Sequence, residues 1–349
     1  MTTTMQSSTD LREYADYDKP LWRRLFLTRE VAVIALLAIV VVFAAAQIQG
    51  FSQPITLSYL ILDVMPILLI ALPMTMVIIT GEIDLSVASM MGLASVLTGV
   101  LTQAGLPFAA AAGIALLAGA VGGALNGFLV TVVGLPSLAV TIGSLALFRG
   151  LAVGLLGTTA VTDFPKFWTD LAKARIGETP IPVVTLLFLA LLIVFAILLH
   201  FTPFGRGVYS IGLSKSAAHF SGVNVERTKF ILFALCGAVS ALAGIYYTLR
   251  YGSARGDNAT GLELQVVAAV LLGGVSIFGG RGALHGVIPG VLLIGVLASA
   301  LRLANVTSDV INIITGLLLV ASVVSTSLAA WVKARTAKLT SSRSQKTTT

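Results

Sequence analysis

Few side chains in this 349-residue sequence could carry out covalent chemistry. The three histidines, His200, His219 and His285, lie far apart and have no carboxylate or cysteine at the spacing of metal ligands, so no metal site is predicted. No nucleophile lies beside a candidate base in the pattern that a hydrolase requires. The phosphate-binding pattern GxxxxGK[ST] is also missing from the sequence. The chain is therefore predicted not to be an enzyme, with no cofactor of its own.

Acidic side chains beside apolar runs are the first candidates for a functional role. Asp84 lies between two such runs, where a bare charge costs about 2.5 to 3.5 kcal/mol on membrane-insertion scales. We expect it to cap the helix that begins near Ser86, with contact to a ligand or a gating role as the alternative. Glu82 is expected to face water. Thr260 and Glu263 have the T-x-x-E spacing of a capping box.

Polar side chains inside the apolar runs are candidate contacts for a transported molecule. Serine and threonine in membrane helices usually bond their own helix, so packing is the competing interpretation for each of them. Arg149 could instead extend its charge toward the membrane surface. The candidates for a substrate pathway are Asn126, Thr141, Ser144 and Asn312, with Arg149 and Thr315 as further possibilities.

The composition fixes the elements that must position these groups. Hydrophobic residues make up 57% of the chain and charged residues 11%, against about 25% charged in soluble domains. The mean hydropathy is +0.98. We therefore predict an all-α integral membrane protein, with the single cysteine, Cys236, buried in a helix.

Because a span needs about 20 apolar residues, the sequence predicts ten spans: 31–49, 57–80, 85–103, 107–133, 137–156, 181–200, 229–250, 263–279, 283–303 and 308–332.

The basic residues predict how these spans are oriented. With both termini in the cytoplasm, 15 of the 22 Lys and Arg residues fall on the cytoplasmic side and 6 on the outside, with Arg149 within a span. The net charge of +7 then reflects topology and anionic lipids, so no nucleic-acid partner is predicted. The predicted domains are a cytoplasmic tail (1–30), a membrane domain (31–332) with a cytoplasmic loop (203–228), and a basic tail (333–349).

The cytoplasmic loop contains a polar stretch rich in small residues, SIGLSKSAAHFSGVNVERTKF. Ser214 is placed to cap a short helix, KSAAHF, and Gly222 to end it. Small residues on this helix would let another protein approach the backbone closely, which predicts a docking helix. An ordinary connecting loop is the alternative.

Three stretches resemble ABC importer permeases of the ribose, galactose and autoinducer-2 type. They are TPFGRGVYSIGLSKSAAHFSGVNVERTK, ALPMTMVIITGEIDLSVASMMGLAS and LELQVVAAVLLGGVSIFGGRGALHGVIPG. The resemblance implies that the first holds a coupling helix that contacts the ATPase, through Phe204, Gly205, Arg206, Ser214, Lys215, Ala217, Ala218, His219 and Gly222. It implies a structural or gating role for Asp84, Ser86, Glu263, Gly273, Gly274, Gly279, Gly280 and Arg281. The sequence departs from the family pattern at Ser214, Ser216, His219, Glu82 and Ala88.

The stretches EIDLSVAS and GLELQVVAA share an acid, a leucine, a polar residue and a valine at the start of a small-residue helix. In the predicted topology one lies inside and the other outside. This favours an inverted internal repeat that relates spans 2–5 to spans 7–10.

The resemblance implies a membrane subunit of a bacterial inner-membrane importer that moves a monosaccharide inward. The implied partners are an ATPase that binds ATP and Mg²⁺, an extracytoplasmic sugar-binding protein, a second permease and membrane lipids. The stretches RYGSARGDNATGLEL and GGVSIFGGRG look closest to those of permeases for rhamnose-like sugars, and permeases for ribose and autoinducer furanoses resemble them nearly as well. An ion-coupled secondary sugar carrier is the alternative, but it predicts paired acids deep in several spans. An intramembrane enzyme is the least favoured.

Overall fold

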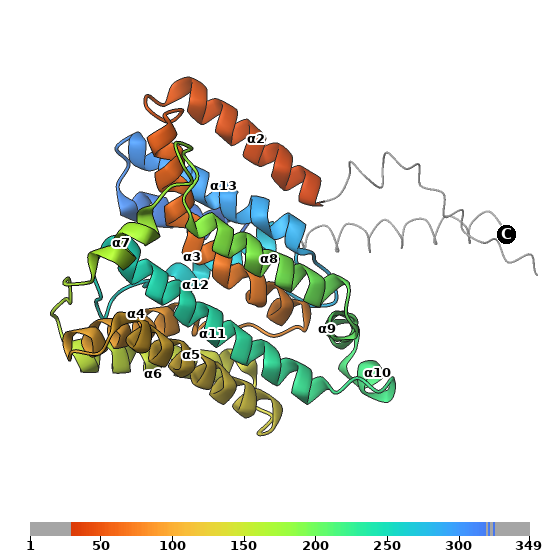
Figure 1. Cartoon of the computed structure of the whole chain (residues 1–349). Helices are drawn as coiled ribbons and strands as arrows, with labels where there is room; N and C mark the ends of the chain where they lie inside the picture. The colour runs from red at the N-terminus through yellow and green to blue at the C-terminus, as the bar shows by residue number, and fades with distance from the viewer. Residues whose placement is uncertain (1–28, 319, 322–323, 325–349) are drawn as a thin grey trace, which may run out of the picture.

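The computed structural model of the chain describes residues 29–318, 320–321 and 324, which fold into helices joined by loops (Figure 1). This part of the chain contains no β-strand and only two isolated bridges, Val161 with Ala254 and Arg175 with Pro182. The predicted all-α class is confirmed. The predicted tails, 1–30 and 333–349, lie outside the described residues apart from Arg29 and Glu30, which begin the first described helix.

The helices follow the predicted apolar runs closely. They are α2 (Arg29–Gln47), α3 (Pro54–Ile79), α4 (Val87–Gln103), α5 (Phe108–Thr131), α6 (Ser137–Leu156), α7 (Lys166–Lys173), α8 (Val184–His200), α9 (Pro203–Leu213), α10 (Lys215–Phe220), α11 (Val225–Tyr251), α12 (Leu262–Leu272) and α13 (Leu284–Leu303), followed by a short apolar helix at Ser308–Leu318. The run predicted at 263–279 is helical only as far as Leu272.

By length and composition, α2, α3, α5, α6, α11 and α13 can each cross a membrane. Helices α8 and α9 qualify together as a seventh span, although they are bent by 65°. Helix α4 has 17 residues and α12 has 11, so both fall below the length of a full span. The chain is a multi-pass membrane protein, but the predicted count of ten spans is not confirmed.

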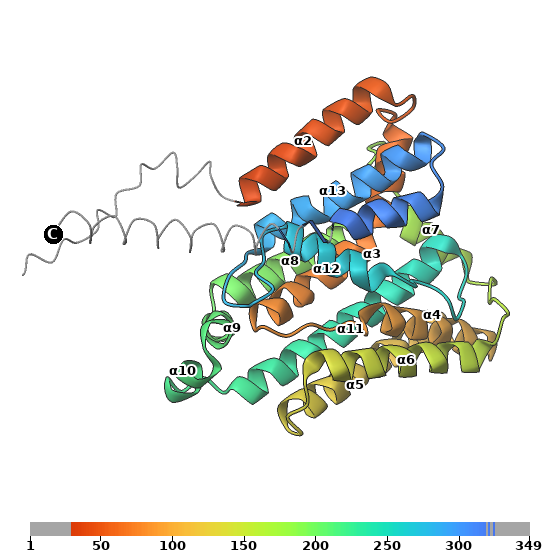
Figure 2. The ribbon, with the colours of Figure 1, turned by 180° about the vertical axis from the view of Figure 1, so that it is seen from behind.

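Helix α3 is the centre of the molecule. Its stretch from Met65 to Ile79 is buried throughout, because almost every side chain is apolar and neighbouring helices surround it. On one side of α3 lie α2, α12 and α13, and on the other side lie α4, α5, α6 and α11 (Figure 2). Two prolines inside α3, Pro66 and Pro73, are tolerated as they commonly are in membrane helices.

The two short helices are each preceded by a non-helical segment. Residues 80–86 lead from α3 into α4, and residues 252–261 lead from α11 into α12. Segment 80–86 starts at the end of the molecule that carries α9 and α10, which we call the α10 end (Figure 1). Segment 252–261 starts at the opposite end, near α7, which we call the α7 end. The predicted inverted repeat would relate these two segments, and it stays a prediction.

Helices α5 and α11 pack closely through glycines. Gly119 and Gly123 of α5 face Gly237 of α11, so that backbone meets backbone. Small residues at such a contact let membrane helices approach one another and gain dispersion energy along their length. Cys236, beside Gly237, is fully buried as the sequence predicts.

Gly123→Ala should therefore destabilise the protein. Its new methyl group would lie 3.0 Å from the Gly237 Cα and collide with the Phe233 carbonyl oxygen. Overpacking of this kind costs about 1 to 3 kcal/mol. The measurement is thermal unfolding of the protein in detergent. The matched control is Gly113→Ala on the same helix, where a Cβ meets nothing within 4 Å; equal melting temperatures for the two variants would refute this account of the packing.

Candidate functional site

The predicted docking helix is present as α10. Ser214 caps it, with its hydroxyl oxygen accepting a hydrogen bond from the Ala217 N–H at 3.3 Å. Gly222 adopts the left-handed conformation, φ +84°, just after the helix ends. These features confirm the predicted cap and stop. Ala217 is exposed, but Ala218 is buried against the chain itself, so only part of the small-residue surface is open to another protein.

The loop that carries α10 rests on the end of α3. The backbone of Gly212, the penultimate residue of α9, lies against the Ile79 carbonyl oxygen and the Gly280 amide, leaving no room for a side chain. The Gly280 N–H donates to the Ile79 oxygen at 2.8 Å. The Tyr209 hydroxyl donates to the Gly282 oxygen at 2.7 Å. The GGRG stretch, residues 279–282, therefore packs against α9 and helps to hold it against the end of α3.

The other residues of this region for which a coupling or gating role was predicted lie close to these contacts of α9. Gly205 packs against the last turn of α8 and donates its N–H to the Thr202 hydroxyl at 3.2 Å. Gly273 ends α12 and packs against Gly286 and Val287 of α13. The remaining members are Phe204 and Arg206 in α9, the exposed His219 in α10, Gly274 and Gly279 with positive φ, and the exposed Arg281. Their roles in coupling or gating stay predictions.

Glu82 is buried, which corrects the prediction that it faces water. Its exposed fraction is 7%, and its carboxylate pairs with Lys215 of α10 at 2.9 Å and with Lys229 of α11. Burial alone would raise the pKa of the Glu82 carboxyl, but the hydrogen bonds from Lys229, Ser137 and Lys215 and the charge of Lys229 bring it below its ordinary value. The site therefore holds a charged carboxylate inside the protein. Sequence reasoning missed it because its partners are more than 130 positions away.

Asp84 does not cap α4. Ser86 occupies the cap position, and Asp84 accepts hydrogen bonds from the Ser86 N–H at 2.9 Å and from its hydroxyl at 2.6 Å. Asn126 of α5 donates to the Ser86 hydroxyl oxygen at 2.9 Å. The buried Asp84, Ser86 and Asn126 thus form one polar chain that fixes the approach to α4.

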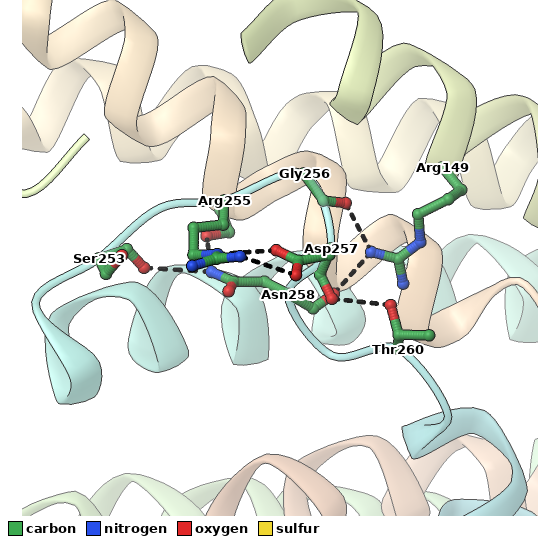
Figure 3. Close-up of polar contacts among 8 residues, drawn as sticks. Arg149, Ser253, Arg255, Gly256, Asp257, Asn258 and Thr260 are labelled. Carbon is green, nitrogen blue, oxygen red and sulfur yellow. Dashed lines mark hydrogen bonds and ion pairs between the residues drawn. The ribbon is translucent and has the colours of Figure 1, made fainter. Parts of the chain in front are cut away.

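Arg149 holds segment 252–261, which leads into α12, in place (Figure 3). One of its terminal nitrogens donates to the Gly256 oxygen at 2.8 Å and to the Asn258 oxygen at 2.7 Å. Asn258 in turn donates to the Ser95 hydroxyl oxygen of α4 at 2.9 Å. Arg149 therefore binds backbone carbonyls inside the protein instead of extending toward the surface.

The predicted capping box is wrong. Gly261, with φ +86°, is the cap of α12, and the Thr260 hydroxyl donates to the Asp257 oxygen at 2.7 Å. No side-chain cap is formed on α12, although Glu263 does lie in its first turn. Within the segment, Arg255 and Asp257 form an exposed ion pair at 2.9 Å, and the Arg255 hydrogen bond holds the pKa of Asp257 below its usual range (Figure 3).

A polar cavity of about 360 Å³ lies at the α7 end, between segment 252–261 and helices α3, α11, α12 and α13. Tyr247 and Tyr251 form one wall, with ring centroids 4.5 Å apart. Asp63 of α3 lies at the cavity and pairs with Arg250 at 3.2 Å and Arg302 at 3.3 Å. Further polar residues at its surface are Asp257, Asn258, Thr260, Gln265 and Ser299. A cavity of this size and polarity fits a small polar molecule.

The four predicted pathway residues do not line this cavity. Asn126 and Thr141 lie against the segment before α4, where the Thr141 hydroxyl donates to the Ile83 oxygen at 3.4 Å. Ser144 bonds the Val140 oxygen of its own helix at 3.0 Å. Asn312 lies at a separate small pocket beside Gln265 and Thr315. Their contact with a transported molecule stays a prediction.

Several helices are long and apolar enough to cross a membrane, and two shorter apolar helices follow non-helical segments, as the interrupted helices of many membrane transport proteins do. The chain belongs to the family described as "Branched-chain amino acid transport system / permease component", which matches residues 56–323. This membership confirms the predicted resemblance to ABC importer permeases.

Curated relatives are similar over most of the chain. The autoinducer 2 import system permease protein LsrD of Escherichia coli O157:H7 is 37% identical over 305 residues, covering 86% of this chain and 92% of that protein. The proteins of the same name in Photorhabdus luminescens and Yersinia enterocolitica are 37% and 36% identical over 266 residues, covering 74% of this chain and 79% and 80% of theirs. No solved structure matches the chain.

Arg149→Met should destabilise segment 252–261, because it leaves the Gly256 and Asn258 carbonyl oxygens without their donor. An unsatisfied buried polar group costs about 1 to 3 kcal/mol. Thermal unfolding should show the loss, and hydrogen exchange should be faster in this segment. Arg255→Met, which removes an exposed ion pair in the same segment, is the control and should change the melting temperature little. An unchanged exchange rate in Arg149→Met would show that Arg149 does not hold the segment.

Proposed function

We propose that the chain is the membrane subunit of a binding-protein-dependent ABC importer in a bacterial inner membrane. The observation that carries the proposal is the family match over residues 56–323, together with relatives named for import. ATP and Mg²⁺ would bind a separate ATPase, and this chain would hold no cofactor. A second permease, a copy or a homologue, would complete the path, and a binding protein would deliver the cargo at the α7 end.

Helix α10 is the proposed contact with the ATPase. Phe220 at its end is 88% exposed, and Leu213 beside it is 71% exposed, although the surrounding loop is polar. Exposed apolar side chains on a polar loop favour a protein partner over lipid. In this arrangement the α10 end is cytoplasmic, which agrees with the distribution of Lys and Arg.

The cargo is proposed to be autoinducer 2 or a similar small molecule rich in hydroxyl groups. The names of the relatives support autoinducer 2 over the rhamnose-like sugar that the sequence favoured. The polar cavity at the α7 end is the proposed entry site. Tyrosine rings there can stack on the apolar face of a small polyol, and the amide of Gln265 can exchange hydrogen bonds with its hydroxyls.

Transport tests this function directly. Proteoliposomes containing the permease complex and its ATPase should take up labelled autoinducer 2 only when ATP and the binding protein are supplied.

Phe220→Asp should lower the amount of ATPase that copurifies and abolish uptake, since a charge replaces an apolar contact. Phe167→Asp, an exposed aromatic residue on α7 at the other end, is the control and should keep the ATPase bound. Uptake driven by an ion gradient without ATP would instead establish a secondary carrier.

Gln265→Leu tests the cavity as the entry site. Loss of a hydrogen bond worth about 1 to 1.5 kcal/mol would raise the KM for uptake by about five- to thirteenfold. Initial rates over a range of cargo concentrations provide the measurement. The control is Leu264→Gln, because Leu264 is its exposed neighbour and does not line the cavity. An unchanged KM in Gln265→Leu would exclude this side chain from cargo binding.

A further inference from the structure

Glu82 is the one acidic side chain of the segment before α4 that reaches the loop carrying α10. It follows α3 by three residues and is buried, its two ion-pair partners come from α10 and α11, and Ser137 of α6 adds a hydrogen bond. Lys215 is the first residue of α10, and Lys229 lies in the first part of α11. A buried carboxylate of this kind is retained only while its charge is compensated, so at least one of the two lysines has to stay beside it.

The two lysines differ in their surroundings. The Lys229 side chain is 6% exposed, so it is fixed inside the protein beside Glu82. The Lys215 side chain is 61% exposed and is attached to a six-residue helix on the surface. Lys229 can keep Glu82 compensated when Lys215 moves away. The Lys215 contact can therefore form and break without leaving a bare buried charge.

Glu82 also continues directly into the segment that positions α4. The next residue, Ile83, has its N–H near the Ser137 hydroxyl oxygen at 3.4 Å, and its carbonyl accepts from Thr141 at 3.4 Å. Asp84 and Ser86 then join this segment to Asn126 of α5. The long contacts of Ile83 to α6 are weak. A pull on Glu82 would accordingly shift residues 82–84 more readily than it would shift a regular helix.

We propose that Glu82 is a positioning residue that couples α10 to α4: a displacement of α10 pulls Glu82 through Lys215 and moves the segment that leads into α4. The proposal rests on the proposed function for the source of that displacement, which is the ATPase. The Gly212 contact with Ile79 and Gly280 links α9 to the end of α3. The Lys215 contact adds a connection that reaches past α3 to the start of α4.

Lys215→Met tests the connection between α10 and Glu82 without replacing a buried side chain. In the full complex with its ATPase, using autoinducer 2 as the cargo, the ATP hydrolysed per molecule imported should rise about threefold or more, a ratio that does not depend on how much ATPase copurifies. Lys215→Arg keeps the charge and should restore the ratio. In a Glu82→Gln background, Lys215→Met should have no further effect, because the contact is already lost. Unchanged ratios, or effects that add in the double variant, would overturn the proposal.

A second measurement uses the isolated full chain in detergent and needs no ATPase. Backbone amides at 82–86 should exchange about threefold or more faster in Lys215→Met than in the unaltered chain or in Lys215→Arg. Equal exchange would overturn the proposed contact even if transport is ATP-dependent. Faster exchange combined with no ATP-dependent uptake by the unaltered complex would leave the contact established and overturn the proposed function instead.

Discussion

The structure depends on one constraint: backbone polar groups inside a membrane protein must be hydrogen-bonded by the protein itself. A helix meets this condition internally, but segments 80–86 and 252–261 are not helical. Each needs side chains from neighbouring helices to bond its exposed N–H and C=O groups. Asn126, Thr141 and Arg149 are side chains of neighbouring helices that bond these two segments.

The two segments meet this constraint by different means. Near α4, several small side chains each contribute one contact, because Ser137 and Thr141 approach Ile83 and Asn126 bonds Ser86. Near α12, the single guanidinium of Arg149 bonds two carbonyl oxygens, and Asn258 is bonded to α4. Arginine suits the second case because its planar group has several donors and no acceptor. Within the first segment, only the contacts of Ile83 with α6 are long, at 3.4 Å.

Sequence periodicity and composition predicted most of the helices, because apolar runs of about 20 residues have few alternatives in a membrane. Ser214 and Gly222 were also predictable, since a cap and a stop are local. The roles of Glu82 and Arg149 were not, because their partners, Lys229 and the Gly256 carbonyl, are more than 100 positions away. The capping box at Thr260 failed because α12 begins one residue later than the box requires: Gly261 is its cap residue, and Thr260 belongs to the preceding turn, where it donates to the Asp257 carbonyl oxygen.

Two ion-pair clusters of similar arrangement join α3 to its neighbours, one toward each end of the molecule. At the α7 end, Asp63 pairs with Arg250 of α11 and Arg302 of α13. At the α10 end, Glu82, just after α3, pairs with Lys229 of α11 and Lys215 of α10. In each case one cation is largely buried on α11 and the other is more than half exposed on a different element. Because a buried acid cannot lose all its partners cheaply, the cations on α11 keep α3 and α11 together, while the exposed cations are the contacts that can be exchanged.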